Sequence, residues 1–413
     1  MVGVDHQALE VLPEAIEVTA LMGAGTKDIG LPVPRQVHTV LIDEVKSVDA
    51  ALNALYRHDL SGFGAVYAYD DPAMMTAAAI GAVLGIRAVP ASVVALFRDK
   101  YLQKQRLHAA GVPVTRHEFI EDIRELPPGY ELPFAAAVVK PVSGQATVST
   151  FVARSTADLA RISRDCRARN VAARNFIIEE FVDGEEWFAD GIVSEGVLRF
   201  ASLGRYAKNC LTAVNERTPV RTFCLDPDTD KTAYDAAMPV VRQALAALGL
   251  RDGIFHMELF HHDGRVVFSE CAARRAGGPI RDQIRHKFGV DLAYYGVQAL
   301  LEPVGDIPVQ LRDGVVASSF LPLVEGTVLD HPDETELAAQ EGVLGARMFV
   351  PRGFRAAPQG ASTFGRMGEF TVHAESESLA TQRLDEIAQW FADRLVVLPL
   401  APTMRELRSL KLR

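Results

Sequence analysis

The first hundred residues alternate short apolar runs with helical patterns, and this alternation restricts the fold more than any other feature of the chain. Three apolar runs are typical of strands: 15–22, 37–42 and 65–69. Two helical patterns cover 47–56 and 72–84, the second with a proline in its first turn. Strands that alternate with helices predict a parallel sheet, because parallel strands need a crossover connection. We therefore expect a doubly wound parallel sheet in an α/β domain over residues 1–97.

The rest of the chain predicts a larger α+β body. Strands are expected near 134–140, 176–181, 187–193, 197–202, 254–260, 265–271, 315–321, 346–350 and 370–373. Helices are expected over 99–110, 155–169, 232–248, 291–301 and 379–395. The polar, basic stretch 203–225 is expected to be a loop. A connection with two prolines at 303–312 divides this body into a central region, 98–302, and a C-terminal segment, 303–413.

Composition and charge exclude several classes of protein. Of the 413 residues, 48% are hydrophobic and 23% charged, which is the balance of a globular protein with a sizeable core. The net charge of −10 argues against a general nucleic-acid binder, which needs a basic face. The four cysteines, Cys166, Cys210, Cys224 and Cys271, form no CxxC pair. This usage favours a reduced, cytoplasmic protein without a zinc knuckle.

Neither a signal peptide nor a membrane span is expected. The first twenty residues contain four acidic residues and lack a basic start. Between residues 72 and 97 the only charge is Arg87, but it divides the stretch into pieces too short to cross a bilayer. We expect a buried helix there, followed by a short strand or loop.

A hairpin late in the chain carries two glutamates on one face. Alternate residues of a strand share a face, so His256 and Glu258 point the same way. A three-residue turn over 262–264 would put His256 opposite Glu270 and Glu258 diagonal to it, with the two carboxylates about 7–8 Å apart at Cβ. Magnesium with its oxygen ligands fits that gap. The alternative is a pair of solvated strand glutamates, and a turn of another length would separate the carboxylates.

Two lysines and an acidic stretch are candidates for holding a phosphorylated ligand. Lys140 ends a buried strand and precedes the small, polar loop 143–147, whose backbone N–H groups can face phosphate oxygens. Lys100 opens a helix, where a phosphate would be stabilised by both the lysine and the helix dipole. Residues 179–186 contain four glutamates that can accept hydrogen bonds from ribose hydroxyls. The alternatives are an edge-strand lysine reaching water, a surface lysine and an acidic surface loop.

These pieces, in this order, resemble the ATP-grasp superfamily and within it the carboxylate–amine ligases. The matching segments are 98–100 with 111–113, 138–141, 178–186, and 255–259 followed by Glu270, Arg274 and Gly277–Gly278. The resemblance covers about residues 98–302, and the alternating region before it also fits. It implies a pair of ATP-grasp α+β subdomains, with 303–413 completing the larger one. Two departures from the family pattern are a phosphate loop with a single glycine, Gly144, and Ala272 in place of an asparagine.

The resemblance also implies a role for each candidate residue. Glu258 and Glu270 would be the ligands of Mg²⁺, or alternatively Mn²⁺. Lys100, Lys140, Ser143 and Gly144 would contact the ATP phosphates. Glu179, Glu180, Val182 and Glu186 would contact adenine and ribose. Lys208, or else Arg217 or Arg221 of the same basic stretch, would reach the γ-phosphate. Arg274 would be catalytic, stabilising an oxyanion or anchoring a carboxylate, unless it is only an ion-pair partner of Glu270 or Glu258.

The activity that the resemblance implies is ATP-dependent ligation of a carboxylic acid to an amine, through an acyl phosphate, with release of ADP and phosphate. Its substrates would be small molecules, with amino acids favoured, and not nucleic acid or membrane. Two alternatives remain: a carboxylase that uses bicarbonate, and a nucleotide-binding regulatory protein without turnover. The sequence leaves the oligomeric state open, with a homodimer as one candidate because dimers are the commonest oligomers. The motifs GxxxxGK[ST], HExxH and GxSxG do not occur in the sequence.

Overall fold

The N-terminal region is a parallel α/β unit. The computed structural model describes residues 1–24, 36–59, 62–356, 362–363 and 365–401. β1 (Thr19–Gly23) and β2 (His38–Ile42) pair in parallel, and single parallel bridges join Val2 to Leu21 and Ala65 to Arg87. The helical elements here are α1 (His6–Val11), α2 (Val48–Arg57), η1 (Asp71–Ala73), α3 (Met74–Leu84) and α4 (Ala91–Arg98). The predicted parallel arrangement is confirmed.

Two local predictions in this region need correction. Residues 65–69 contribute one bridge and no strand, and the stretch expected to be strand or loop before residue 97 contains helix α4. Val94 and Phe97 give α4 a buried face, while its other residues are at least partly exposed. A short helix with an apolar stripe and a short buried strand are hard to separate by periodicity alone.

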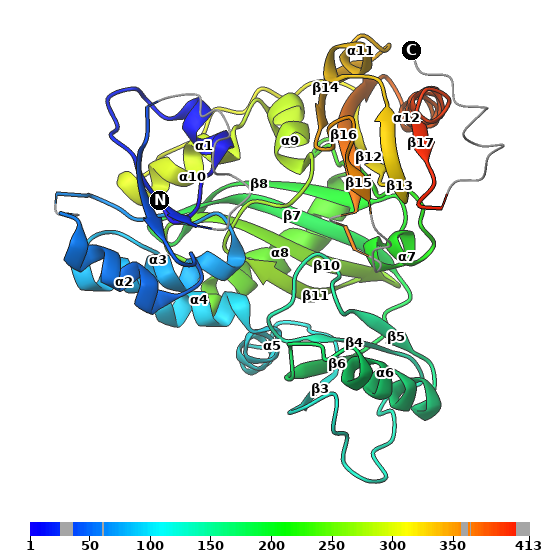
Figure 1. The fold of residues 1–413 in the computed structure, drawn as a ribbon, viewed down its shortest axis with the longest axis horizontal. Helices are drawn as coiled ribbons and strands as arrows, with labels where there is room; N and C mark the ends of the chain where they lie inside the picture. Colours follow the sequence, from blue (N-terminus) through cyan, green and yellow to red (C-terminus); the bar gives the residue numbers. More distant parts are fainter. Residues whose placement is uncertain (25–35, 60–61, 357–361, 364, 402–413) are drawn as a thin grey trace.

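A small antiparallel sheet forms a separate lobe at the bottom of Figure 1. Its strand order is β3 (His117–Ile120), β6 (Phe176–Glu180), β4 (Ala137–Pro141) and β5 (Phe151–Ala153). α6 (Thr156–Ala168) packs on it through Leu159 and Ile162, and the Ser155 hydroxyl caps this helix by accepting from the Asp158 N–H. α5 (Lys100–Ala109), capped by Asp99, connects the N-terminal region to this lobe.

The large antiparallel sheet has eight strands, and its order brings the C-terminal segment beside the central region. The order is β11 (Arg265–Ala272), β10 (Gly253–His262), β7 (Glu185–Ser194), β8 (Val197–Tyr206), β9 (Arg221–Cys224), β12 (Val315–Pro322), β16 (Arg366–Ala374) and β14 (Val343–Met348). Three more strands form a small sheet in the order β15 (Arg355–Ala356), β13 (Gly326–Asp330) and β17 (Val396–Leu398).

The predicted loop over 203–225 is wrong. β8 continues to Tyr206, α7 (Cys210–Asn215) follows, and β9 closes the stretch. Two of the basic residues that favoured a solvated loop are ion-paired with α12 (Glu377–Ala392): Arg205 with Glu377, and Arg221 with Asp385 at 2.7 Å. These acidic partners lie more than 150 residues away, so sequence-local reasoning does not find them.

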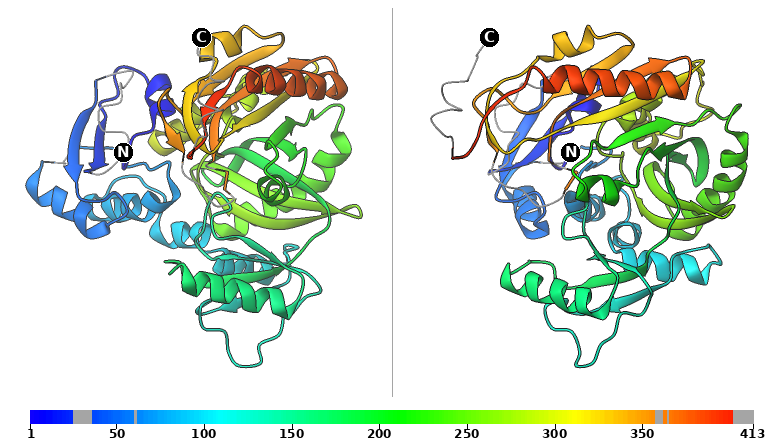
Figure 2. Two further views of the ribbon diagram at one scale, coloured as in Figure 1. Left: turned by 45° about the vertical axis from the view of Figure 1, so that its right-hand side comes forward. Right: turned by 90° about the vertical axis from the view of Figure 1, so that its right-hand side faces the viewer.

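Helices cover both faces of the large sheet. α8 (Lys231–Leu248) packs against the face formed by Phe255, Met257 and Leu259. α9 (Ile280–Phe288) and α10 (Leu292–Leu301) lie on the opposite face, where a Cβ at Gly296 would meet the Ile254 side chain at 2.5 Å. α12 runs across the C-terminal strands (Figure 2), and the short α11 (Glu334–Ala338) precedes β14. α9 was not predicted.

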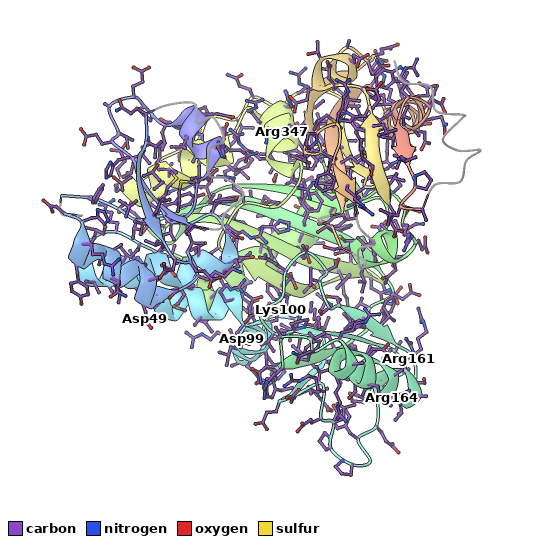
Figure 3. All side chains as sticks on the ribbon, viewed as in Figure 1. Asp49, Asp99, Lys100, Arg161, Arg164 and Arg347 are labelled. Atoms are coloured by element: carbon purple, nitrogen blue, oxygen red, sulfur yellow. The ribbon has the colours of Figure 1, made fainter. Side chains whose placement is uncertain are left out.

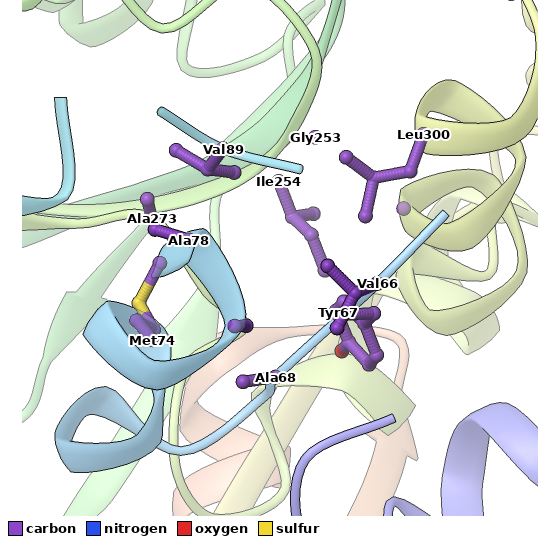
Figure 4. Close-up of a pocket in the computed structure, with 12 residues that line it drawn as sticks. Val66, Tyr67, Ala68, Met74, Ala78, Val89, Gly253, Ile254, Ala273 and Leu300 are labelled. Carbon is purple, nitrogen blue, oxygen red and sulfur yellow. The ribbon is translucent and has the colours of Figure 1, made fainter. Parts of the chain in front are cut away.

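The N-terminal unit and the large sheet are packed together by apolar and charged contacts. A small apolar cavity lies at this junction, lined by residues of both parts that include Val66, Met74, Ile254 and Leu300 (Figure 4). Beside it, Arg275 makes two 2.7 Å hydrogen bonds to the buried carboxylate of Asp5. Among the described residues, no helix is long and apolar enough to cross a membrane.

Candidate active site

The β10–β11 hairpin places Glu258 directly opposite Glu270. Its turn has two residues, Asp263 and Gly264, both with positive φ, and His262 pairs with Arg265. The predicted three-residue turn is therefore wrong, and this shorter turn alone would put the two carboxylates on opposite faces. A β-bulge restores the alignment, because Leu259 pairs with Phe268 and Glu258 with Glu270, leaving Ser269 as the extra residue.

The bulge changes the neighbours of both glutamates. His256 pairs with Ala272 and not with Glu270 as expected, and Glu258 is opposite Glu270 rather than diagonal to it. Directly opposed residues lie about 4.5–5.5 Å apart at Cβ, closer than the predicted diagonal. The two carboxylates still share a face because two deviations from the prediction cancel. The turn is one residue shorter than predicted, and β11 has one extra residue at the bulge.

A third carboxylate lies diagonally across the same face. Because Glu258 pairs with Phe188 and Phe260 with Glu186, the Glu186 side chain points to the side of Glu258. The Cys210 N–H donates to Glu186 at 2.6 Å, but burial, followed by the charge of Glu258, raises the pKa of Glu186 to about 8. The site thus offers several carboxylate oxygens on one face, and oxygen is the ligand atom that a hard divalent cation prefers.

The donor set fits a metal that shares its coordination with another ligand. Over the part of the chain that the structure describes, no group of three or more His, Cys, Asp or Glu side chains could hold a metal by itself. The Glu258–Glu270 pair would therefore hold Mg²⁺ together with ligand oxygens, as one or two carboxylates do when magnesium binds substrate phosphates.

His256 fixes the orientation of Glu258. Its Nδ1 lies 3.1 Å from both carboxylate oxygens of the buried Asp190, and its Nε2 lies 3.6 Å from Glu258 Oε1. Burial would lower the pKa of His256, but the carboxylates of Asp190 and Glu258 outweigh it and raise the pKa to about 10. The protonated ring is held by one carboxylate and faces the other. Sequence reasoning missed Asp190, although its alternation with Glu186 along one strand was a usable signal.

Two lysines from outside the large sheet converge on Glu270. Lys140 Nζ, at the end of β4, lies 3.1 Å from Glu270 Oε2 and 3.3 Å from Glu179 Oε1. Lys100 Nζ lies 3.5 Å from Glu270 and donates to the Gly144 carbonyl at 2.9 Å. Burial would raise the pKa of Glu270, but Lys100 and Lys140 hold it well below its usual range. Figure 3 shows Lys100 at the start of α5, between the large sheet and the small lobe.

The loop after Lys140 contains two successive non-glycine residues with positive φ. Ala146 and Thr147 have φ of 53° and 59°, in the left-handed region that favours glycine. Successive residues in such conformations can turn their N–H groups toward one anion. The loop is fixed from two sides, because the Ser143 carbonyl accepts from Arg98 at 3.0 Å and the Ala146 carbonyl accepts from the Ser362 hydroxyl at 3.0 Å.

Comparison with known proteins agrees with this geometry. A family model described as an ATP-grasp domain matches residues 133–282. This range includes β4, which carries Lys140, and β10, which carries Glu258. The chain therefore contains a region similar to ATP-grasp domains. The L-arginine-specific L-amino acid ligase of Bacillus subtilis is 21% identical over 322 residues, covering 76% of this chain and 77% of that one.

Solved structures of a ligase and of a carboxylase domain share the fold over nearly the whole chain. The L-amino acid ligase of Bacillus licheniformis superposes with a TM-score of 0.76 at 18% identity, covering 97% of this chain and 98% of that one. The biotin carboxylase domain of 2-oxoglutarate carboxylase from Hydrogenobacter thermophilus, crystallised with MgADP and bicarbonate, has a TM-score of 0.66 at 15% identity, over 95% and 87% of the two chains. At these identities the likeness shows the fold alone.

Some candidate residues lie apart from the carboxylate–lysine cluster. The Glu180 side chain accepts from the Arg116 backbone N–H at 2.9 Å and from its Nε at 2.6 Å. Val182, half-buried, lies between β6 and β7. Lys208 pairs at 2.5 Å with Glu216, and its side chain is 45% exposed. Arg217 and Arg221 have acidic partners of their own, Glu325 and Asp385.

Arg274 has a partner that sequence reasoning did not consider. Its Nε donates to Asp71 at 2.8 Å, and its Nη1 donates to the Arg275 carbonyl at 2.7 Å. Burial would lower the pKa of Arg274, but Asp71, followed by Glu270 and Glu258, raises it. Arg274 is therefore close enough to Glu258 and Glu270 for their charges to affect its pKa, but its side-chain ion pair is with Asp71 of the N-terminal unit.

Two buried residues of α5, Gln103 and Lys104, were also missed. Both contact β11 at the residues flanking Glu270. The spacing of Lys100 and Lys104, four residues apart in a predicted helix, places them on the same side of that helix and was the available signal.

Proposed function

We propose that this protein is an ATP-dependent carboxylate–amine ligase that acts on amino acids and releases ADP and phosphate. The observation that carries the proposal is the convergence of Lys100 and Lys140 on Glu270, which lies opposite Glu258 on one face of the large sheet. Alternating carboxylates and ammonium groups suit a polyphosphate and a divalent cation together. The amino-acid ligases among its relatives support the class of reaction.

In this proposal each residue near the cluster has a defined task. Glu258 and Glu270 would hold Mg²⁺, which would supply positive charge beside the terminal phosphates. Lys100 and Lys140 contact phosphate oxygens, and Ser143 and Gly144 supply loop backbone to them. A substrate carboxylate attacks the γ-phosphorus, the bond to the β–γ bridging oxygen breaks, and ADP leaves, giving an acyl phosphate. An amine then attacks the acyl carbon, phosphate leaves, and the nitrogen gives up a proton to form the amide.

The remaining candidates act around that cluster. Arg274 stabilises the oxyanion that forms as the amine attacks, or anchors a substrate carboxylate. Glu179, Glu180, Val182 and Glu186 line the side where adenine and ribose bind. Lys208 reaches the γ-phosphate if the α7 segment closes and its pair with Glu216 opens. A homodimer is part of the proposal, and light scattering at assay concentration tests it.

An ADP-release assay tests the proposed activity. The purified protein, with magnesium and ATP, is incubated with a matrix of amino acids offered singly and in pairs, and with bicarbonate. Release that needs both an acid and an amine, with an amide detected by mass spectrometry, is the expected result. Release stimulated by bicarbonate alone indicates the carboxylase, and nucleotide binding without release indicates the regulatory protein; either result contradicts the ligase.

A further inference from the structure

Lys104 of α5 is a lysine with a fully buried side chain. A charged group is costly to bury without partners, and this one has two: its ammonium donates to the Ser269 carbonyl and lies 3.5 Å from Glu179 Oε2. The Phe268 ring lies 5.6 Å from the same ammonium. Burial lowers the pKa of Lys104 to about 8, although the Glu179 carboxylate opposes this shift, so the group is mostly charged at neutral pH.

The first partner, Ser269, is the bulge residue that aligns the metal carboxylates. The ladder between β10 and β11 skips Ser269, so its backbone is not paired with β10 in the regular way. β11 is also the edge strand of the large sheet. Lys104 donates a hydrogen bond to the carbonyl of Ser269. The extra residue Ser269 is what turns Glu270 to the same face as Glu258.

The second partner, Glu179, connects Lys104 to the phosphate lysine. One carboxylate oxygen of Glu179 faces Lys104 at 3.5 Å, and the other faces Lys140 at 3.3 Å. Glu179 is only 3% exposed, and burial alone would raise its pKa, but Lys104 and then Lys140 lower it. Glu179 is therefore kept ionised between two ammonium groups. This favours a structural role for Glu179 in addition to its proposed contact with the nucleotide.

Gln103 hydrogen-bonds to β11 on the other side of Glu270. Its Nε2 donates to the Cys271 carbonyl at 2.8 Å, and the Cys271 N–H donates to its Oε1 at 2.8 Å. The side chain is buried and supplies the donor and the acceptor that a neighbouring strand would supply. Two consecutive residues of α5 thus bind the backbone of both neighbours of Glu270.

We propose that Lys104, together with Gln103, is a positioning residue for MgATP binding: it holds the Ser269 bulge, and with it Glu270, and through Glu179 it holds Lys140. It touches neither metal nor nucleotide. This inference rests on the proposed function for the roles of Glu270 and Lys140. The competing explanation is that Lys104 only stabilises the fold, in which case its loss lowers stability without a selective effect on nucleotide.

Lys104→Met separates the two explanations, because methionine keeps most of the length and removes the ammonium. The matched control is Gln105→Met, an exposed position next along the same helix. We expect the folded Lys104→Met protein to bind MgATP about 10–100-fold more weakly and to need more magnesium for half-saturation, which is the scale for loss of an outer partner of a metal ligand. The KM for the amine should stay within about twofold, and the control should match wild type throughout.

Binding measurements keep this test independent of turnover. MgATP affinity and magnesium half-saturation are measured by calorimetry, with folding checked by circular dichroism and thermal unfolding. Wild-type affinity in folded Lys104→Met, or an activity loss explained by a smaller folded fraction alone, overturns the inference. If Lys104→Met does not fold, Gln103→Met carries the test, with raised magnesium half-saturation expected and an unchanged value overturning it. If wild type binds MgATP but ligates no acid–amine pair, the proposed function fails while the positioning role is still measured.

Discussion

At the scale of single residues, the charge of Glu258 is the clearest target. Glu258→Gln keeps the size of the side chain but removes a metal-ligating charge, and it leaves His256 facing a neutral amide. We expect phosphate release to fall at least about 100-fold and magnesium half-saturation to rise. Glu302→Gln, at an exposed position, serves as control. Phosphate release near the wild-type rate at ordinary magnesium would remove Glu258 from the metal site.

Glu369 predicts a pH dependence of stability. Burial raises its pKa to about 7 from 4.5, although Arg366, whose Nε lies 3.2 Å from it, and Arg347 lower it. The folded protein keeps this proton up to about pH 7, whereas the unfolded chain loses it near pH 4.5. Folding therefore takes up a proton between these values, and stability falls as pH rises, by about 3 kcal/mol from this group.

Glu369→Gln removes that titration. Urea unfolding of both proteins at pH 5 and pH 8 measures it, and the difference in stability between the two pH values should be smaller in the variant by on the order of 3 kcal/mol. An equal pH dependence in the two proteins would show that Glu369 is ionised throughout this range.

At the scale of an element, the loop after β4 stores backbone strain. A non-glycine residue in the left-handed region costs about 1–2 kcal/mol, while glycine costs about 0.5–1 kcal/mol in chain entropy. Ala146, at φ 53°, should therefore accept glycine with a gain of up to about 1 kcal/mol in stability, measured by urea unfolding. Ala168→Gly, in helix α6, should instead lose stability. A loss at Ala146 equal to that at Ala168 would contradict the strain.

At the scale of the whole molecule, Arg275 joins the N-terminal unit to the large sheet. Its guanidinium makes two 2.7 Å hydrogen bonds to Asp5, and both side chains are at most 5% exposed. Arg275→Met leaves a buried carboxylate unpaired, so we expect a loss of about 3–5 kcal/mol in unfolding free energy. Adding Asp5→Asn should recover part of that loss. Additive effects of the two substitutions in urea unfolding would show that the pair is not coupled.

Much of the fold can be predicted from local sequence signals. The helices that begin at Lys100, Thr156 and Leu292 form where expected, each capped by the side chain before it, and the period-two strands around Glu258 and Glu270 form where expected. The reason is that a cap or an alternation depends on residues within about four positions along the chain. The same local signals identified Lys100, Lys140, Glu258 and Glu270 as candidates.

Only the tertiary structure decided how those candidates meet. The Ser269 bulge, the burial of Lys104, the Asp71 partner of Arg274 and the strand at 221–224 were not predictable. Register is set by a whole strand pair, and a one-residue slip reverses every side chain. Burial and charge pairing depend on residues that are far apart in the sequence: Asp71 and Arg274 are 203 positions apart, and Asp5 and Arg275 are 270 apart. The sequence alone thus determined which groups the site contains, and long-range packing determined which of them face one another.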